Sequence, residues 1–184
     1  ARTYARIDGE LTWENWIAAV KAGRTMATNG PLLFARVDDQ EPGAVLTGRK
    51  STTVSIKLNT ITPVEVIEIL VDGKIVRAVP VSENQRQFSG RETVPVSGAR
   101  WIAVRARGGK ARYCGDNYTF AHTSPVYFAD VPSNEASRAS STFLTEVIKE
   151  LWRRVDERNA WVKREQRTAY KRHIDEALSR LTRQ

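Results

Sequence analysis

The sequence contains few of the residues that most often build metal centres and covalent cross-links. It has one cysteine, Cys114, among 184 residues, so no disulfide can form within the chain and a zinc site built on cysteines is excluded. It has only two histidines, His122 and His173. No apolar run approaches the roughly 20 residues that a membrane-spanning helix needs. These shortages exclude a disulfide-rich fold and predict a chain without a membrane partner.

The first residues, ARTYARIDGELTW, contain neither a signal peptide nor an initiator methionine. We therefore expect a soluble chain that is a mature product or a piece of a longer protein. A single cysteine leaves the redox compartment open, so a cytoplasmic and an exported location both agree with the sequence.

Positive charge is in excess but is mixed with negative charge along the chain. The formal net charge is +8. Residues 133–184 contain 12 Lys and Arg against 8 Asp and Glu, and the preceding 132 residues contain 17 against 13. Runs such as RRVDER and KREQR interleave the two signs, as a solvated helix face does. Because the basic and aromatic patterns typical of single-strand binders are missing, the sequence disfavours nucleic acid as a partner.

Hydrophobic periodicity divides the chain into three segments. Residues 1–33 predict a helix followed by a strand, residues 34–132 predict an antiparallel β-sandwich, and residues 133–184 predict a helical tail. The expected fold class is therefore mainly β with α, an immunoglobulin-like sandwich with helical segments on both sides in the sequence. The cysteine pair of a true immunoglobulin domain is absent, so the prediction is limited to a sandwich-like architecture.

Local signals are strong in the first segment. Thr12 is placed to cap a helix with apolar residues at three- and four-residue spacing, and Gly23 is placed to end it. RTMAT then predicts a short strand, and Asn29-Gly30 before Pro31 predicts a constrained turn.

The same helix carries an apolar face that needs a partner. Trp13, Trp16 and Ile17 lie on that face, and one helix–strand unit cannot bury it alone. We expect this unit to leave an exposed apolar patch or to form a dimer through it.

The second segment contains about seven short strands with no helical period between them. Asp72-Gly73 lies between two apolar runs and is the strongest hairpin signal in the chain. The runs RQFSGRETVPV, ARWIAVRAR and NYTFAHTSPVYF supply further strands, and SG, GGK and CGDN are typical of the turns between them.

The tail begins with a predicted polar linker, SNEASRASS, and continues with two apolar stripes. The first comprises Leu144, Ile148, Leu151 and Val155, with Phe143 and Val147 beside them, and the second comprises Tyr170, Ile174, Ala177, Leu178 and Leu181. The period is lost near Asn159 without a Gly or Pro, so a helical hairpin and one long helix both remain open. We expect the stripes to make core contacts, with a coiled-coil dimer as the alternative.

No complete active site can be assembled from the residues. His173 lies in the basic tail and is expected to be solvated. His122 shares a strand face with an aromatic residue, which favours a structural histidine bonded to backbone or to a hydroxyl. Ser124 lacks the G-x-S-x-G elbow of a serine nucleophile, and a grouping of Cys114 and Asp116 with His122 matches no zinc pattern.

One ordered set of motifs resembles a known family. LTWENWIAAVKAGRTMATNGPLLF is followed by a Val-x-x-x-x-Pro-Gly turn, then by VIEILVDGKIV, ARWIAVRARG, FAHTSPVYF and FLTEVIKEL. In this order the motifs resemble the C-terminal portion of the CehA/McbA family, which are metallohydrolases of the polymerase-and-histidinol-phosphatase type. The resemblance covers nearly the whole chain.

The resemblance implies an accessory role. Members of that family have a distorted β/α barrel with the metal site, followed by a β-sandwich and a helical tail. Residues 1–33 would be the last piece of the barrel, and the family's His-x-His and Asp-x-His ligands would lie upstream of this sequence. The chain itself would then hold no metal and have no hydrolase activity. The longer parent would carry a divalent metal (Zn, Mn or Fe), and its barrel would be the partner of this chain, with a homo-oligomer as a further possibility.

The resemblance also singles out three residues. Arg24, Asn29 and His122 match polar positions of recurrent family motifs, which implies a place facing the active site at the mouth of the barrel. Asn29 has an alternative role as a residue that tolerates positive φ beside Gly30. The alternative function for the whole chain is a sandwich module that binds a ligand or a protein, such as a carbohydrate, through exposed tryptophans such as Trp101 or Trp161.

Overall fold

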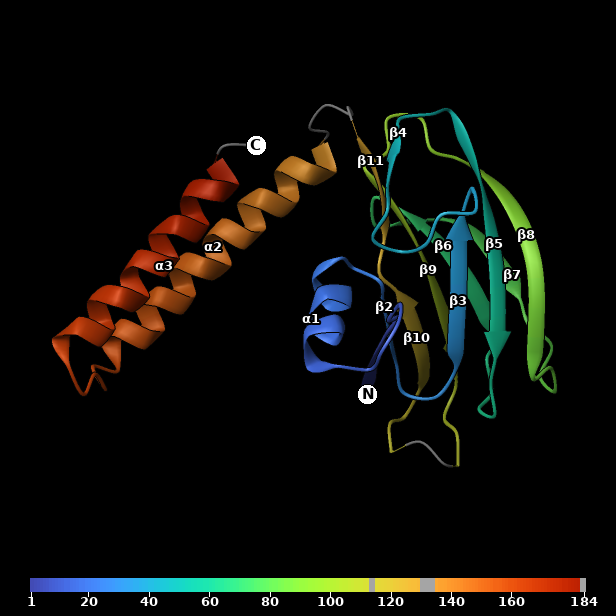
Figure 1. Cartoon of the computed structure of the whole chain (residues 1–184), viewed down its shortest axis with the longest axis horizontal. Helices are drawn as coiled ribbons and strands as arrows, with labels where there is room; N and C mark the ends of the chain where they lie inside the picture. Colours follow the sequence, from blue (N-terminus) through green and yellow to red (C-terminus); the bar gives the residue numbers. More distant parts are fainter. Residues whose placement is uncertain (113–114, 130–134, 183–184) are drawn as a thin grey trace. The chain divides into compact units, whose positions relative to one another are not determined.

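The fold was obtained as a computed structural model that describes residues 1–112, 115–129 and 135–182. The chain divides into two compact units, residues 1–131 and 132–184 (Figure 1). The predicted helix–strand unit 1–33 therefore belongs to the same compact unit as the predicted sandwich. Cys114 lies outside the described residues.

The first unit is built on a large sheet, sheet A, which has eight strands among the described residues. Strand β9 is at its centre, with β6 and then β7 on one side and β10 and β11 end to end on the other. Strands β2 and β1 extend the sheet beyond β10, and β4 pairs in parallel with β11. The strands are β1 (Arg2–Ala5), β2 (Thr25–Thr28), β4 (Val45–Thr47), β6 (Val66–Val71), β7 (Lys74–Pro80), β9 (Trp101–Gly108), β10 (Thr119–Thr123) and β11 (Val126–Ala129).

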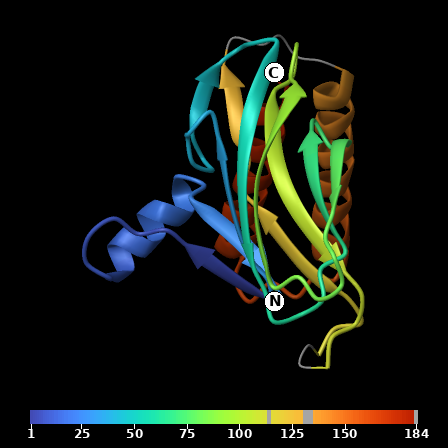
Figure 2. The same ribbon diagram turned by 90° about the vertical axis from the view of Figure 1, so that its right-hand side faces the viewer.

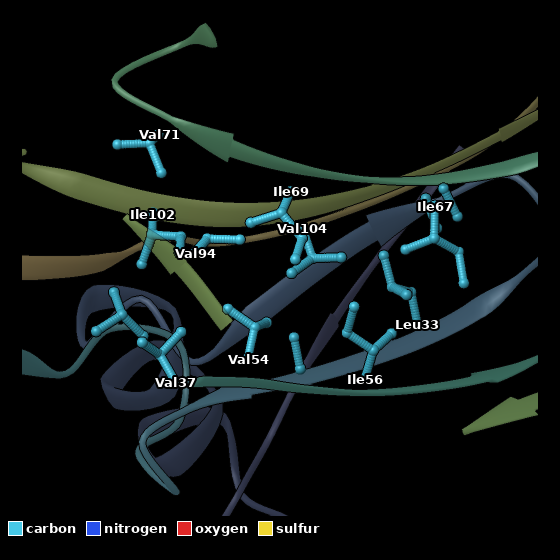
Figure 3. Packing of buried hydrophobic residues seen from close by; sticks show 14 of the residues in the cluster. Leu33, Val37, Val54, Ile56, Ile67, Ile69, Val71, Val94, Ile102 and Val104 are labelled. Atoms are coloured by element: carbon cyan, nitrogen blue, oxygen red, sulfur yellow. The ribbon is translucent and has the colours of Figure 1, made fainter. Parts of the chain in front are cut away.

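A smaller sheet, sheet B, packs against sheet A. It consists of β3 (Leu32–Val37), β5 (Ser51–Asn59) and β8 (Gln87–Pro95), all antiparallel. Alternating residues of these strands point inward, as period-2 patterning requires. Figure 3 shows Val54 and Ile56 of sheet B facing Ile69 and Val104 of sheet A, all of them buried. This arrangement confirms the predicted fold class, a mainly β sandwich with helices.

The two sheets differ in width, and sheet A extends past the edge of sheet B. Sheet B ends at β3, whereas sheet A continues through β2 to β1. In Figure 2 the blue segment with β1 and the helix lies to one side of the two layers. The core-facing side of β1 therefore has no strand of sheet B opposite it. Strand β1 itself was not predicted, because its four residues, three of them exposed and Ala5 half-buried, carry no alternating pattern.

Helix α1 (Trp13–Lys21) has the predicted boundaries. Thr12 accepts a hydrogen bond from the backbone amide of Asn15 at 3.2 Å, which caps the amino end. Gly23 follows the helix with φ of +69°, the left-handed conformation that ends many helices. The predicted Asp72-Gly73 hairpin is also confirmed: β6 and β7 flank it, and both turn residues have positive φ, as a type I′ turn requires.

The second unit contains two helices, α2 (Glu135–Glu157) and α3 (Arg164–Thr182), which pack on each other. Of the two arrangements left open by the sequence, the helical hairpin is found, and Asn159 at the break has φ of +46°. The predicted linker at 133–141 was wrong from Glu135 onward, because its Glu, Ala and Arg residues favour helix and continue α2. Residues 133 and 134 lie outside the described residues.

The apolar stripe of α3 is packed as expected, whereas that of α2 is not. Ile174 of α3 is buried, and its stripe neighbours are at least half-buried. In α2, Leu144 and Leu151 are each 44% exposed, which corrects the expectation of core contacts there. Trp152 instead faces α3 and stacks on Tyr170, with ring centroids 6.3 Å apart. Among the described residues, no helix is long and apolar enough to cross a membrane.

Candidate functional site

The part of sheet A that extends past β3, formed by β1 and β2 and called the overhang below, borders a cavity with a volume of about 750 Å³. One wall comes from β1 and the start of β2, and the other comes from β3 and the outer face of sheet B. The cavity exists because β1 continues sheet A past the edge strand β3. Its size falls within the range of about 300–1,000 Å³ that is typical of small-molecule sites.

A network of ion pairs lines part of the cavity. Arg6 and Arg36 both pair with Glu41, at 2.6 Å from Arg36, and Arg24 pairs with Asp8. Each of these three arginines already has a carboxylate partner, and with two carboxylates the network retains one net positive charge. Its evident role is to fix β1 against the loop that follows β3.

Two further cations line the cavity without such partners. Lys57 and Arg91 have no carboxylate within ion-pair distance in the described part of the chain, and both are exposed. Ser55 lies between them, because it pairs directly with Arg91 across β5 and β8 and is two residues from Lys57 on the same face. Asp39 also lines the cavity, from the turn after β3.

Two aromatic side chains are exposed at the cavity. Tyr4 of β1 is 45% exposed and Phe34 of β3 is 53% exposed, and both line it. Phe34 pairs directly with Lys57 across β3 and β5. An aromatic surface and a free ammonium group therefore lie next to each other on sheet B.

The structure does not bring the three predicted site residues together in this cavity. Arg24 lines it and is held by Asp8. Asn29 is in the β2–β3 turn and does not line it. Its Oδ1 accepts from the backbone amide of Phe120 at 2.7 Å, and its Nδ2 donates to the carbonyl of Tyr118 at 2.8 Å and to Asp116 at 2.9 Å.

His122 lies on the face of sheet A that points away from sheet B. It stacks on Phe120, with ring centroids 6.2 Å apart, which confirms that the two share a strand face. Its neighbour Thr123 is buried and lines the cavity on the opposite face. Burial lowers the pKa of His122, and the positive charge of Arg105 lowers it further.

Next to His122, a carboxylate is buried between two arginines. The Glu68 side chain is 3% exposed and accepts hydrogen bonds from Arg105 at 2.7 Å and from Arg107 at 2.5 Å. The bond from Arg107 lowers the pKa of Glu68, and the bond from Arg105 adds to this effect. Both carboxylate oxygens of Glu68 are bonded to these two arginines, so the cluster is a structural ion-pair group. Glu68 is therefore not available as an acidic partner for His122.

Sequence reasoning missed Tyr4, Phe34, Lys57 and Arg91. Alternation along β5 and β8 places Lys57 and Arg91 on the outer face, where a charged residue is the ordinary choice. Only the packing of β1 beside that face turns it into a cavity wall. No local sequence pattern could have predicted this wall, because it depends on the pairing of β1 with β2 and on the position of sheet B.

His173 is 71% exposed on its side chain, as expected. Within the described ranges, no group of three or more His, Cys, Asp or Glu side chains is placed to hold a metal ion. Comparison of the chain with protein-family models, with curated proteins and with solved structures found no match.

Proposed function

We propose that this chain is the accessory C-terminal region of a metal-dependent hydrolase, of the phosphoesterase, ester or carbamate type. The resemblance of its ordered motifs to the CehA/McbA family supports the proposal. On this resemblance, the zinc, manganese or iron of such a hydrolase would be bound by the family's His-x-His and Asp-x-His ligands, upstream of this sequence. The role of this chain is then to bind and position rather than to catalyse.

The exposed face of α1 is the observation that carries this proposal. Trp13 is 70% exposed and stacks on Trp16, with ring centroids 5.5 Å apart, and Leu11 before the helix is 80% exposed. Ala19 is the one buried residue of α1. Such an apolar surface favours contact with another protein surface, and the barrel of the parent would supply it.

Two measurements test the proposal. The coding sequence that precedes the codon of Ala1 is expected to encode an Asp-x-His motif, and an in-frame stop codon shortly before it would contradict the proposal. The chain is also incubated with Mn²⁺ or Zn²⁺ and a chromogenic phosphodiester or aryl ester. We expect no hydrolysis that a chelator abolishes, and chelator-sensitive turnover that is lost in His122→Ala would overturn the accessory role.

The α1 face has a matched test of its own. Trp13→Ser is expected to leave the melting temperature nearly unchanged, because Trp13 is exposed, and to lower the fraction of fluorescence that acrylamide quenches. A homodimer that covers this face would instead protect Trp13 and double the mass in light scattering. That outcome would show that the partner of the α1 face is a second copy of this chain and not the barrel.

A second candidate function is a ligand-binding sandwich module, and the cavity at the overhang favours it. Its two exposed aromatic side chains and two free cations are the elements of a binding site. The alternative of a carbohydrate bound through Trp161 has less support, since that ring packs against Trp152 and Tyr170. Saturable binding of a small ligand that Phe34→Ala weakens is the test.

A further inference from the structure

We propose that the cavity at the overhang binds a small organic phosphate, with an aromatic ring against Phe34 and the phosphate between Lys57 and Arg91. The proposal rests on the second candidate function and names the ligand class.

Strand register places the two cations around one point. Lys57 pairs with Ser89, and Arg91 pairs with Ser55, so Lys57 and Arg91 are diagonal neighbours on the outer face of β5 and β8. Diagonal neighbours in an antiparallel pair have backbones about 7–8 Å apart, within reach of long side chains. The Ser55 hydroxyl lies on the same face and adds a donor.

Charge balance selects an anion. The cavity is lined by five cations and by two carboxylates, those of Asp39 and Glu41. Glu41 is occupied by its arginines, as Arg24 is by Asp8. The groups left over are Lys57, Arg91 and Asp39, and Asp39 makes no ion pair with either cation. Two neighbouring cations against one carboxylate favour a group with several charged oxygens. Arginine binds phosphate through two parallel hydrogen bonds, and lysine adds a compact positive charge.

The exposed aromatic side chains favour a ligand that carries an aromatic ring next to its phosphate. Phe34 is the direct cross-strand partner of Lys57, so a ring that lies on Phe34 is next to the phosphate position. Tyr4 approaches from β1, on the opposite wall. Stacked rings attract each other beyond the effect of the apolar area that they bury. A single-ring phosphate satisfies both features within one cavity.

The volume of the cavity favours a small molecule over a polymer. About 750 Å³ holds a ligand of one or two rings. Arg6, Arg24 and Arg36 are held in ion pairs, so the unpaired cations do not continue through them as a track along which a nucleic-acid backbone would run.

The test is a calorimetric titration of the full chain with phenyl phosphate at low salt, compared with benzoate, inorganic phosphate and phenol. We expect phenyl phosphate to bind with a Kd of about 1 mM or lower, and at least tenfold more tightly than the other three. Lys57→Gln and Arg91→Gln should each weaken binding about tenfold, and Phe34→Ala should reduce the preference for phenyl phosphate over inorganic phosphate. Because all three residues are exposed, these variants are expected to fold, and their melting temperatures check this.

Two matched controls remove a cation elsewhere on the same unit. Arg86→Gln and Lys74→Gln change exposed residues outside the cavity and should leave the Kd unchanged. Equal weakening by the control variants would overturn the proposal, because it would show a nonspecific charge effect. Tighter binding of a thymidine oligonucleotide, lost in the same variants, would overturn it in favour of single-stranded nucleic acid.

The titrations also distinguish a wrong ligand class from the absence of any binding function. If benzoate binds as tightly as phenyl phosphate and Phe34→Ala abolishes both, the cavity is a ligand site but the phosphate assignment is wrong. If no probe shows saturable binding at about 10 mM, the ligand class and the binding function both fail.

Discussion

Asn29 and Phe120 hold each other through two hydrogen bonds of opposite direction. The backbone amide of Asn29 donates to the carbonyl of Phe120 at 3.0 Å, and the amide of Phe120 donates to Asn29 Oδ1 at 2.7 Å. The side chain of Asn29 thus replaces a backbone carbonyl and continues the ladder between β2 and β10 past the last paired residue. This gives Asn29 a structural role in the turn that leads from sheet A to sheet B.

Asn29→Ala is therefore expected to lower the free energy of unfolding by about 2 kcal/mol, because the half-buried amide of Phe120 and the carbonyl of Tyr118 both lose a hydrogen-bond partner. Asn29→Asp should cost more, because it places a carboxylate oxygen next to the carbonyl of Tyr118 and the carboxylate of Asp116. Urea denaturation measures both. The nearby exposed Asn117→Ala is the control, and an equal loss in it would contradict this role.

Helix α1 is fastened by a contact that tolerates no side chain. A Cβ on Gly43 would lie 1.8 Å from the carbonyl oxygen of Ala22, at the carboxyl end of α1. We expect Gly43→Ala to lower the free energy of unfolding by about 3 kcal/mol or more. Gly98→Ala is the matched control, because Gly98 also has positive φ but has open space around it, and it should cost about 1 kcal/mol. Similar losses in thermal unfolding of the two variants would show that φ alone is responsible.

The buried Glu68 should be far more sensitive than a surface carboxylate. Glu68→Gln is expected to cost about 3 kcal/mol at pH 7, because it removes the charge that two arginines share. Arg107 and Arg105 lower the pKa of Glu68 below its ordinary value of 4.5. The contribution of the charge is therefore complete above pH 4.5 and is lost as the pH falls through the lowered pKa. The difference between wild type and variant should narrow in that range.

Glu92→Gln is the control for that measurement. Glu92 pairs with Arg77 at 2.9 Å on a more exposed surface, and its loss is expected to cost about 0.5 kcal/mol. Guanidinium denaturation at several pH values compares the two variants. A cost for Glu92→Gln as large as that for Glu68→Gln would argue against a special role of burial.

Because of His122, the free energy of unfolding is expected to fall in mild acid. Burial lowers the pKa of its imidazole below the ordinary 6.5, so the unfolded chain takes up the proton first. The contribution of neutral His122 is complete above pH 6.5 and falls below it, with a slope of at most about 1.4 kcal/mol per pH unit. His122→Phe keeps the ring on Phe120 and should flatten the slope between pH 6.5 and pH 5. His173→Gln, on an exposed residue, should leave it unchanged, and an equal effect of both variants would contradict the assignment.

Thr119 offers a route to a more stable protein. Its hydroxyl is buried and has no hydrogen-bond partner among the described residues. Thr119→Val keeps the shape and removes an unsatisfied polar group, so we expect a gain of about 1 kcal/mol. Thr123→Val is the matched opposite case, because the Thr123 hydroxyl accepts from the amide of Val104 at 3.1 Å. Differential scanning calorimetry should show a rise for the first variant and a fall for the second, and a fall in both would point to a hydrogen bond at Thr119.

The features that the sequence predicted well depend on neighbours along the chain. Thr12 and Gly23 mark the ends of α1 through bonds within one turn, and Asp72-Gly73 forms a hairpin with the strands on either side. These signals act over a few residues, so periodicity and turn chemistry suffice to read them. The break near Asn159 is also a local feature, but no Gly or Pro marked it, so the sequence left a hairpin and one long helix both open there.

The features that were missed depend on residues far apart in sequence. Tyr4 meets the outer face of sheet B only because β1 pairs with β2 and β2 with β10. No periodicity in the first residues reports that pairing, and a lysine on an outer strand face, such as Lys57, needs no ligand to explain it. The cavity therefore could not be predicted from the sequence, because the sequence contains its residues but does not show that they come together. The family role of Arg24, Asn29 and His122 stays a prediction.

The position of β2 in sheet A has a consequence for the order in which the protein is made. Its partner β10 lies about 90 residues later in the chain. Most of the first unit has therefore emerged from the ribosome before β2 and β1 can join sheet A. Sheet B and the hairpin of β6 and β7 can form before that point, whereas the overhang cannot. During synthesis the tryptophans of α1 would stay uncovered and unanchored, which makes this interval the time when a chaperone, or a neighbouring domain that has already folded, matters most.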